Sequence, residues 1–426
     1  MEKCYVTSNN VNIYKYPGDH VHSFSLSMYV KAGSMYETSE DNGISHFIEH
    51  IVIRNINYLM DGELYRYLDR YGLMFNACTY KEFVQFEITG APKNYYKAAD
   101  VFVKLFEEIT LPSSEIDIER NRIKAEIRED DDKDKLTYFA NQTVWKGTSL
   151  AQTITGNSTG LNRMGKNVLR EAHKKMMVPD NLFVYVTGRV GDAELAYLTA
   201  ALEKYELKPG GLDRNNIAEI PEGFADRNCM VVTKQHKDSV IRFSFDLEDK
   251  GYPQAAYMLL YDILFDCENS KLHQALSEEA GFIYSFDSVM EEYSNIGVLC
   301  FQYEVQPAHL LESVEIVVKL LKELKKGITD ELDYVRSTYI DNSEMILDDP
   351  SDFNWMLAYE AHILSKAPAD IEKRKAGYER VTVEQLTMLA REIFRSSNLV
   401  VSLKGKKSIK GERKIREIVA ALDQED

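Results

Sequence analysis

Two histidines and a glutamate lie within five consecutive positions of the sequence, at His46, Glu49 and His50. If this stretch is a helix, with about 100° of rotation per residue, the three side chains share one face. Two imidazoles one turn apart can bind one zinc ion, and the carboxylate beside them can activate a water molecule. The order His-x-x-Glu-His is the reverse of the commoner His-Glu-x-x-His zinc helix. The alternative is a chance pattern on the solvated face of a helix.

The opposite face of the same predicted helix is apolar, as expected for a helix that packs on a core. Its residues are Ile44, Phe47, Ile48 and Ile51. Upstream, residues 11–32 predict a β-hairpin, because two alternating runs flank the turn Pro17-Gly18-Asp19. Downstream, a helix over residues 61–71 and a β-rich segment over residues 74–88 are expected.

A further helix is predicted to begin near Ser114, and it carries Glu119 and Glu126. The two glutamates are seven residues apart and therefore share a helix face. Paired glutamates on a helix are usually solvated, because this side chain is seldom buried without a partner. The pattern alone therefore leaves both a solvated and a functional role open.

One phrase occurs twice along the chain, which predicts an internal duplication. Asn181 and Asn398 each open a strand-like segment that ends in glycine seven residues later, at Gly188 and Gly405. The two asparagines are 398 − 181 = 217 positions apart, close to half of the 426 residues. We therefore predict two similar α/β domains, residues 1–208 and 229–426. They would be joined by a linker over residues 209–228, which is rich in glycine, proline and asparagine.

Composition restricts the class of protein. Hydrophobic residues make up 44% and charged residues 28% of the chain, as in a soluble globular protein. The formal net charge of −17 argues against nucleic acid and anionic membranes as partners. It would favour a cationic peptide if the negative charge lined a cavity, whereas a merely acidic surface is the alternative. Five scattered cysteines and the absence of a signal-peptide pattern at residues 1–8 predict a cytoplasmic protein with free thiols.

Taken together, several segments resemble the zinc peptidases with an inverted motif, the family of pitrilysin, insulin-degrading enzyme and the mitochondrial processing peptidase. The chain is most similar to the short bacterial members of about 50 kDa, and the resemblance covers nearly all of it. The matching segments are Gly33 to Glu37 with Gly43 to His50, then Asn76-Ala77-Cys78-Thr79, Glu119 to Ile127, and Leu276 to Tyr284.

The resemblance implies an α+β fold of two duplicated domains, each a mostly antiparallel sheet with helices packed on one face, which together form half of a clamshell. It also implies a zinc metalloendopeptidase that cleaves short or unfolded peptides in an enclosed chamber. The implied zinc ligands are His46, His50 and Glu126, with Glu49 as the general base and Glu119 as a residue that orients a ligand. The implied substrate-binding residues are Asn76, Ala77, Cys78, Thr79 and Tyr284, with the segment around Asn76 pairing with an extended peptide.

One departure from the family pattern concerns the substrate clamp. The family often carries an arginine seven residues before the position of Tyr284, and this chain has Ser277 there. Serine cannot replace a bidentate guanidinium. Two interpretations follow: a homodimer that tolerates the change, or a heterodimer whose related partner supplies an Arg/Tyr pair. The segment after the metal helix, residues 51–55, also departs from the usual family sequence.

Peptide maturation by removal of a leader and general peptide turnover are equally compatible with these residues. A non-catalytic structural or binding subunit of a two-chain peptidase complex is the competing function. Members of that kind typically lose the zinc motif, whereas this chain keeps the three implied ligands and the base.

Overall fold

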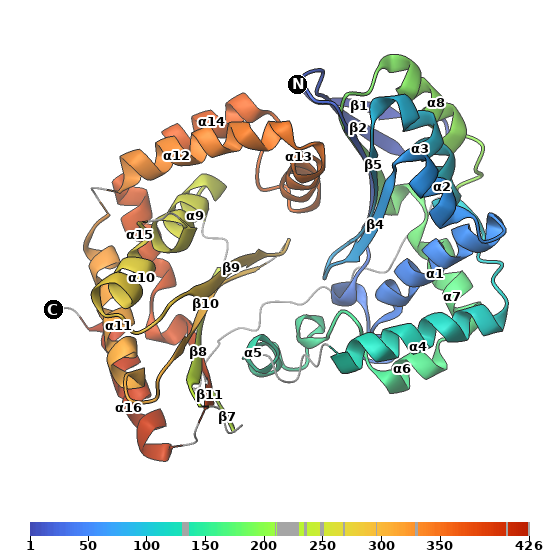
Figure 1. Cartoon of the computed structure of the whole chain (residues 1–426). Coiled ribbons are helices and arrows are strands. Elements are labelled where there is room, and N and C mark those ends of the chain that lie inside the picture. The colour runs from blue at the N-terminus through green and yellow to red at the C-terminus, as the bar shows by residue number, and fades with distance from the viewer. Residues whose placement is uncertain are drawn as a thin grey trace. The chain divides into compact units, whose positions relative to one another are not determined.

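The computed structural model describes residues 1–129, 136–208, 210, 230–233, 237–247, 251–266, 269–294, 296–328, 331–405 and 408–424. Within this part of the chain, no helix is long and apolar enough to cross a membrane. The chain divides into two compact units (Figure 1). Unit 1 comprises Met1–Asp132, Gly147–Ala218 and Glu344–Ser365, and unit 2 comprises Lys133–Lys146, Glu219–Ser343 and Lys366–Asp426. Of the predicted linker, residues 209–228, only Gly210 lies among the described residues.

Unit 1 contains a six-stranded sheet with helices on one face (Figure 1). Its strands, in spatial order, are β1 (Lys3–Val6), β2 (Asn12–Pro17), β6 (Leu182–Gly188), β3 (Phe24–Val30), β5 (Val84–Gly90) and β4 (Met74–Thr79). Its helices include α1 (Ile44–Leu59), α2 (Leu64–Tyr71), α3 (Tyr95–Phe102), α4 (Ser113–Glu129), α6 (Ser158–Arg163), α7 (Lys166–Met176) and α8 (Asp192–Leu202).

The predicted hairpin over residues 11–32 is wrong. Both of its strands exist, as β2 and β3, but β6 lies between them. β6 pairs with β2 in parallel and with β3 in antiparallel orientation. The turn residues therefore end β2 without setting the pairing, because a strand about 160 positions later supplies the hydrogen bonds.

Unit 2 repeats the plan of unit 1. Its sheet has the order β7 (Met230–Thr233), β11 (Leu399–Gly405), β8 (Ser239–Leu247), β10 (Gly297–Val305) and β9 (Phe286–Glu292). Its helices include α5 (Leu136–Val144), α9 (Gln254–Tyr261), α10 (Lys271–His273), α11 (Leu310–Lys326), α12 (Leu332–Met345), α14 (Ile371–Glu379), α15 (Val383–Ile393) and α16 (Ile409–Ala420). One pair is parallel, β7 with β11, and the others are antiparallel.

The predicted duplication is confirmed at the level of strand order and direction. The series β2-β6-β3-β5-β4 in unit 1 corresponds to β7-β11-β8-β10-β9 in unit 2. The two repeated asparagines also make equivalent hydrogen bonds. The side-chain amide of Asn181 donates to the carbonyl of Met176, and that of Asn398 donates to the carbonyl of Ile393. In each unit the asparagine closes the turn between a helix and the strand that follows it.

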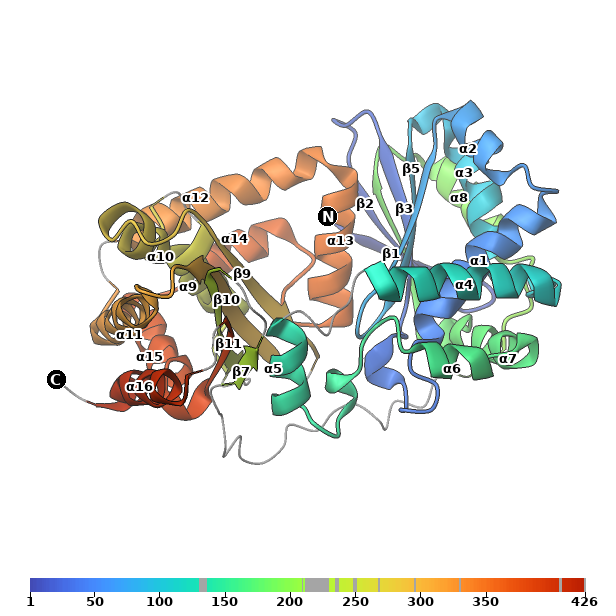
Figure 2. The same cartoon turned by 60° about the horizontal axis from the view of Figure 1, so that its bottom comes forward.

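Each sheet also receives a helix on its second face, and this helix comes from the other half of the sequence. Helix α13 (Pro350–Leu357) contacts β3 and β6 of unit 1, and α5 contacts β11 of unit 2 (Figure 2). Asn354 of α13 is fully buried and accepts a hydrogen bond from the Tyr29 hydroxyl. The predicted boundaries did not anticipate this exchange of two segments.

Helix α1 is fixed on the core of unit 1 by its apolar face. Phe47, Ile48 and Ile51 are fully buried, and the partly buried Ile44 packs against the same cluster. The N-terminus of the helix is held by Glu37, whose carboxylate accepts hydrogen bonds from the backbone N–H groups of Gly43 and Ser45. A carboxylate in this position satisfies free N–H groups and complements the helix dipole.

Candidate metal centre

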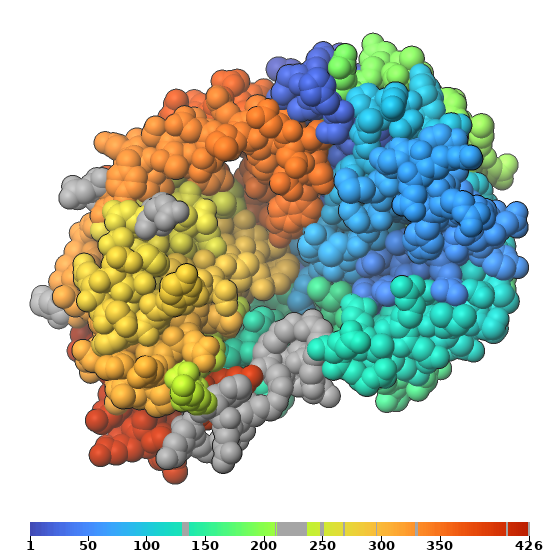
Figure 3. All heavy atoms as spheres, in the orientation of Figure 1, coloured from blue at the N-terminus to red at the C-terminus, as the bar shows by residue number. Residues whose placement is uncertain are grey.

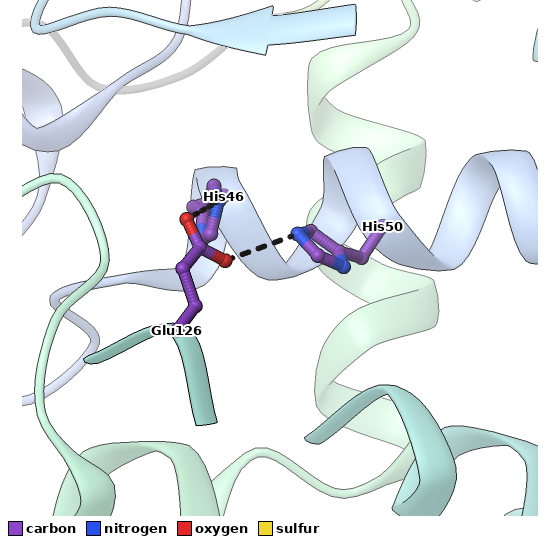
Figure 4. Close-up of side chains that lie close together, drawn as sticks. All are labelled: His46, His50 and Glu126. Carbon is purple, nitrogen blue, oxygen red and sulfur yellow. Dashed lines mark ion pairs between the residues drawn. The ribbon is translucent and has the colours of Figure 1, made fainter. Parts of the chain in front are cut away.

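His46, His50 and Glu126 converge in unit 1, as the resemblance implied (Figure 4). The two histidines project from α1 and the glutamate projects from α4. Nε2 of His46 lies 3.5 Å from one carboxylate oxygen of Glu126, and Nε2 of His50 lies 3.7 Å from the other. These distances are longer than those of good hydrogen bonds. They are close to the separation of roughly 3.4 Å that two ligands about 2.1 Å from a tetrahedral zinc would have.

The protonation state of His46 suits metal binding. Burial, followed by the neighbouring His50, lowers the pKa of His46 to about 4. The imidazole is therefore neutral at pH 7, which is the form that binds a metal ion. Its buried Nδ1 has no hydrogen-bond partner among the described residues.

His50 is oriented by Glu119. Nδ1 of His50 lies 3.1 Å from Oε2 of Glu119, and Glu119 is almost fully buried. An ionised carboxylate only accepts hydrogen bonds, so Nδ1 carries the proton and Nε2 presents its lone pair towards Glu126. Burial raises the pKa of Glu119, but hydrogen bonds from His50, Arg54 and Arg122 outweigh it and bring the pKa to about 2. Glu119 therefore stays ionised and holds His50 in one tautomer.

Arg54 and Arg122 are the residues that sequence reasoning missed. All three nitrogens of the Arg54 guanidinium contact carboxylates of α4. Nη1 donates to Glu119 at 2.6 Å, and Nε and Nη2 both pair with the carboxylate of Glu115. Nη1 of Arg122 donates to Glu119 as well, at 3.1 Å. Arg54 lies in the segment that departs from the family pattern, and this departure was the available signal. Its position four residues after His50 places it on the metal face of α1.

Glu49 is positioned by the edge strand β4. Its carboxylate accepts a hydrogen bond of 2.6 Å from the Thr79 hydroxyl. Burial raises the pKa of Glu49, and the bond from Thr79 opposes part of that rise. A carboxyl whose pKa is raised towards neutrality is a more effective general base than a solvated one.

The other substrate-binding residues that the resemblance implied are distributed over both units. Along β4, Asn76 and Cys78 are exposed, Ala77 is half-buried, and Thr79 is buried against Glu49. Strand β4 pairs with β5 on one edge and has no partner among the described strands on the other. Tyr284 belongs to unit 2, where its side chain is 95% exposed beside a hollow of about 570 Å³. Ser277 is half-buried in the same unit.

Comparison with known proteins identifies the family. Residues 17–158 match the family described as "Insulinase (Peptidase family M16)", and residues 163–337 match "Peptidase M16 inactive domain". The chain belongs to peptidase family M16. It is 26% identical over 335 residues to an uncharacterized zinc protease, YmxG, of Bacillus subtilis, which covers 78% of this chain and 80% of that protein. Over 149 residues it is also 26% identical to cytochrome b-c1 complex subunit 1 of Bos taurus, covering 34% and 31% of the two chains.

Solved structures of proteases share the fold. A protease from Helicobacter pylori superposes with a TM-score of 0.81 at 19% identity, covering 95% of this chain and 99% of that one. The first half of the periplasmic protease PqqL from Escherichia coli gives 0.80 at 16% identity, covering 98% and 96%. Against the whole of PqqL the match covers 50% of that chain. The predicted α+β fold of two similar domains, each with a mostly antiparallel sheet, is thereby confirmed.

Proposed function

We propose that the protein is a zinc metalloendopeptidase that cleaves short or unfolded peptides. The observation that carries the proposal is the convergence of His46, His50 and Glu126 beside the hydrogen-bonded carboxylate of Glu49. Two imidazoles and one carboxylate form a common ligand set of catalytic zinc sites and leave a position open. Zinc bound there would polarise a scissile carbonyl and make a water molecule more acidic.

The roles of the protein groups follow from their contacts. The Thr79 hydroxyl holds Oε2 of Glu49 and thereby orients the carboxylate, which could take a proton from the attacking water. The same carboxyl can then deliver this proton to the leaving amine. Because Thr79 ends β4, a peptide paired with the free edge of that strand would run past the base. Main-chain pairing explains why an extended or unfolded segment is the proposed substrate.

The test replaces the base and keeps the ligands. We expect the Glu49→Gln protein to bind about one zinc ion per chain, as the wild type does, and to lose at least ~100-fold in peptide cleavage. Metal content is measured by elemental analysis and cleavage by mass spectrometry of a mixed peptide pool. Removal of zinc by a chelator should abolish cleavage by the wild type, and added zinc should restore it. Undiminished cleavage by pure Glu49→Gln protein contradicts the proposal.

The second candidate is a non-catalytic subunit, and two comparisons favour it. A subunit of the cytochrome b-c1 complex is among the similar proteins, and residues 163–337 match a domain described as inactive. Zinc content separates the candidates, because a native protein without zinc supports a structural role.

We propose in addition that the protein works in the cytoplasm as a dimer. The described cysteines Cys4, Cys78 and Cys300 are free thiols, which agrees with a reducing compartment. Ser277 in place of the family arginine leaves two arrangements equally open, namely a heterodimer whose related partner supplies an Arg/Tyr pair and a homodimer that tolerates the change. The native mass of the complex purified from its source distinguishes the two.

A further inference from the structure

A hollow of about 340 Å³ lies directly beside the candidate metal centre, within unit 1. Helix α1 lines it with Glu49, His50, Ile53 and Asn57, α2 adds Tyr65, and α4 adds Arg122. In Figure 3 the surfaces of α2 (lighter blue) and α4 (teal) flank that of α1 (darker blue). A substrate group next to the bond being cleaved would therefore have this hollow within reach.

Most hydrogen-bonding groups of the hollow are already engaged. Both oxygens of Glu119 accept hydrogen bonds, from His50, Arg54 and Arg122. The guanidinium of Arg54 already donates hydrogen bonds to Glu119 and Glu115. Glu49 accepts a hydrogen bond from Thr79 and is proposed as the base, so the carboxylates of the hollow offer a ligand little acceptor capacity.

The groups that remain available are donors. Arg122 uses only Nη1 on Glu119, and its side chain is 63% exposed, so Nε and Nη2 are available. The side-chain oxygen of Asn57 accepts from the backbone N–H of Leu64, which leaves its NH2 group. The hydroxyl of Tyr65, in a side chain that is 56% exposed, has no partner in the described part of the chain. A guanidinium, an amide NH2 and a hydroxyl together suit an acceptor of negative charge.

We infer that this hollow binds a carboxylate of the peptide next to the scissile bond, with Arg122 as the residue that selects it. The inference rests on the proposed peptidase function and names the chemistry of its substrate. Two sources share this chemistry, namely an aspartate or glutamate side chain and the C-terminal α-carboxylate of the peptide.

Other side chains fit the hollow less well. A lysine or arginine of the substrate would bring a cation against Arg122, which like charge disfavours. An apolar side chain would cover Arg122 and desolvate its Nε and Nη2 without offering them an acceptor, at a free-energy cost. The net charge of −17 repels acidic peptides in general, so a preference for them would have to come from this local donor set.

The test compares matched peptides and matched variants of the full-length, zinc-loaded protein. Quenched fluorescent peptides carry Glu, Gln or Lys at each position in turn, and mass spectrometry locates the cleaved bond. We expect kcat/KM to be about tenfold higher for Glu than for Gln beside that bond, as one charged hydrogen bond would give. In protein whose zinc content matches that of the wild type, Arg122→Met should bring the ratio of kcat/KM for Glu over Gln peptides close to one, whereas Arg122→Lys should keep part of this ratio. A change that acts only through Glu119 would lower kcat/KM for both peptides alike and leave the ratio as it is.

The matched control is Arg66→Met. Arg66 is 80% exposed, makes a similar pair with Glu63 three residues away, and does not line the hollow. Its removal should leave the preference for Glu intact. Peptides with a free or amidated C-terminus distinguish the two sources, because only a terminal carboxylate loses its advantage on amidation. An equal loss for Glu and Gln peptides in Arg122→Met, or no initial preference, overturns the inference.

Binding measurements separate this inference from the proposed function. Zinc-loaded Glu49→Gln protein is titrated with the same peptides, and fluorescence anisotropy reports the dissociation constants without turnover. If the wild type cleaves no peptide but the Glu peptide binds more tightly in a manner that depends on Arg122, the function fails and the carboxylate site stands. If cleavage occurs without any preference, the carboxylate site alone fails.

Discussion

At the scale of single residues, the metal centre depends on charges that lie one contact away from the ligands. Glu119 fixes the tautomer of His50, and Arg54 and Arg122 fix Glu119. The pKa of Glu119, brought to about 2, means that this support is intact throughout the neutral range. Arg54 also ties α1 to Glu115, so it links the helix of the histidines to the helix of Glu126. Groups of this kind commonly change metal affinity when they are removed.

Arg54→Met should therefore weaken zinc binding by about 10- to 100-fold, because Glu119 loses its shortest hydrogen bond and His50 its fixed orientation. Competition with a chromophoric chelator measures the dissociation constant at pH 7. Glu119→Gln should have a similar effect, and the double variant should lose little more, since both changes act on His50 through one contact. Zinc affinity within twofold of the wild type in Arg54→Met would show that Arg54 merely pairs with α4.

At the scale of elements, local patterns predicted helices well and long-range pairing poorly. The spacing of His46, Glu49 and His50 placed them on one face, because a helix repeats over a few residues. Glu126 needed a family resemblance, since 76 residues separate it from His50 and spacing cannot report contact between helices. Arg54 was visible only as a departure from the family pattern, because its pairing depends on how α1 and α4 pack.

The strands show the same limit. The turn chemistry of Pro17-Gly18-Asp19 predicted a hairpin, yet β6 lies between β2 and β3. The repeat of Asn181 and Asn398 did predict the duplication, because each asparagine marks the entry to the strand that occupies this inserted position in its own unit. The sequence therefore showed that the strands after Asn181 and Asn398 are equivalent, whereas the pairing of the strands was visible only in the structure.

At the scale of the whole molecule, the two units are not the two halves of the sequence. Helix α13 covers the second face of the unit 1 sheet, and its polar side chains form hydrogen bonds with residues of that sheet. Asn354 accepts a hydrogen bond from Tyr29 and donates to the carbonyl of Tyr185, and Ser351 donates to Glu87. Without α13 these sheet residues would lose the hydrogen bonds to Asn354 and Ser351, and the aromatic surface of the sheet would be exposed to water.

A fragment of residues 1–208, the domain predicted from sequence, should therefore fold poorly on its own, although it contains every residue of the metal centre. Buried hydrogen bonds of about 1 kcal/mol each would be missing, and apolar surface of the sheet would be uncovered. A synthetic peptide of residues 344–365 should raise the midpoint of thermal unfolding, and the rise should grow with the logarithm of peptide concentration above its dissociation constant, since the peptide binds only the folded fragment. The same peptide with Asn354→Leu should be much weaker, because the Tyr29 hydroxyl would then be buried without its acceptor. Unfolding is followed by circular dichroism with and without each peptide. A fragment that melts cooperatively at the temperature of the full chain, and ignores both peptides, would show that α13 is dispensable to unit 1.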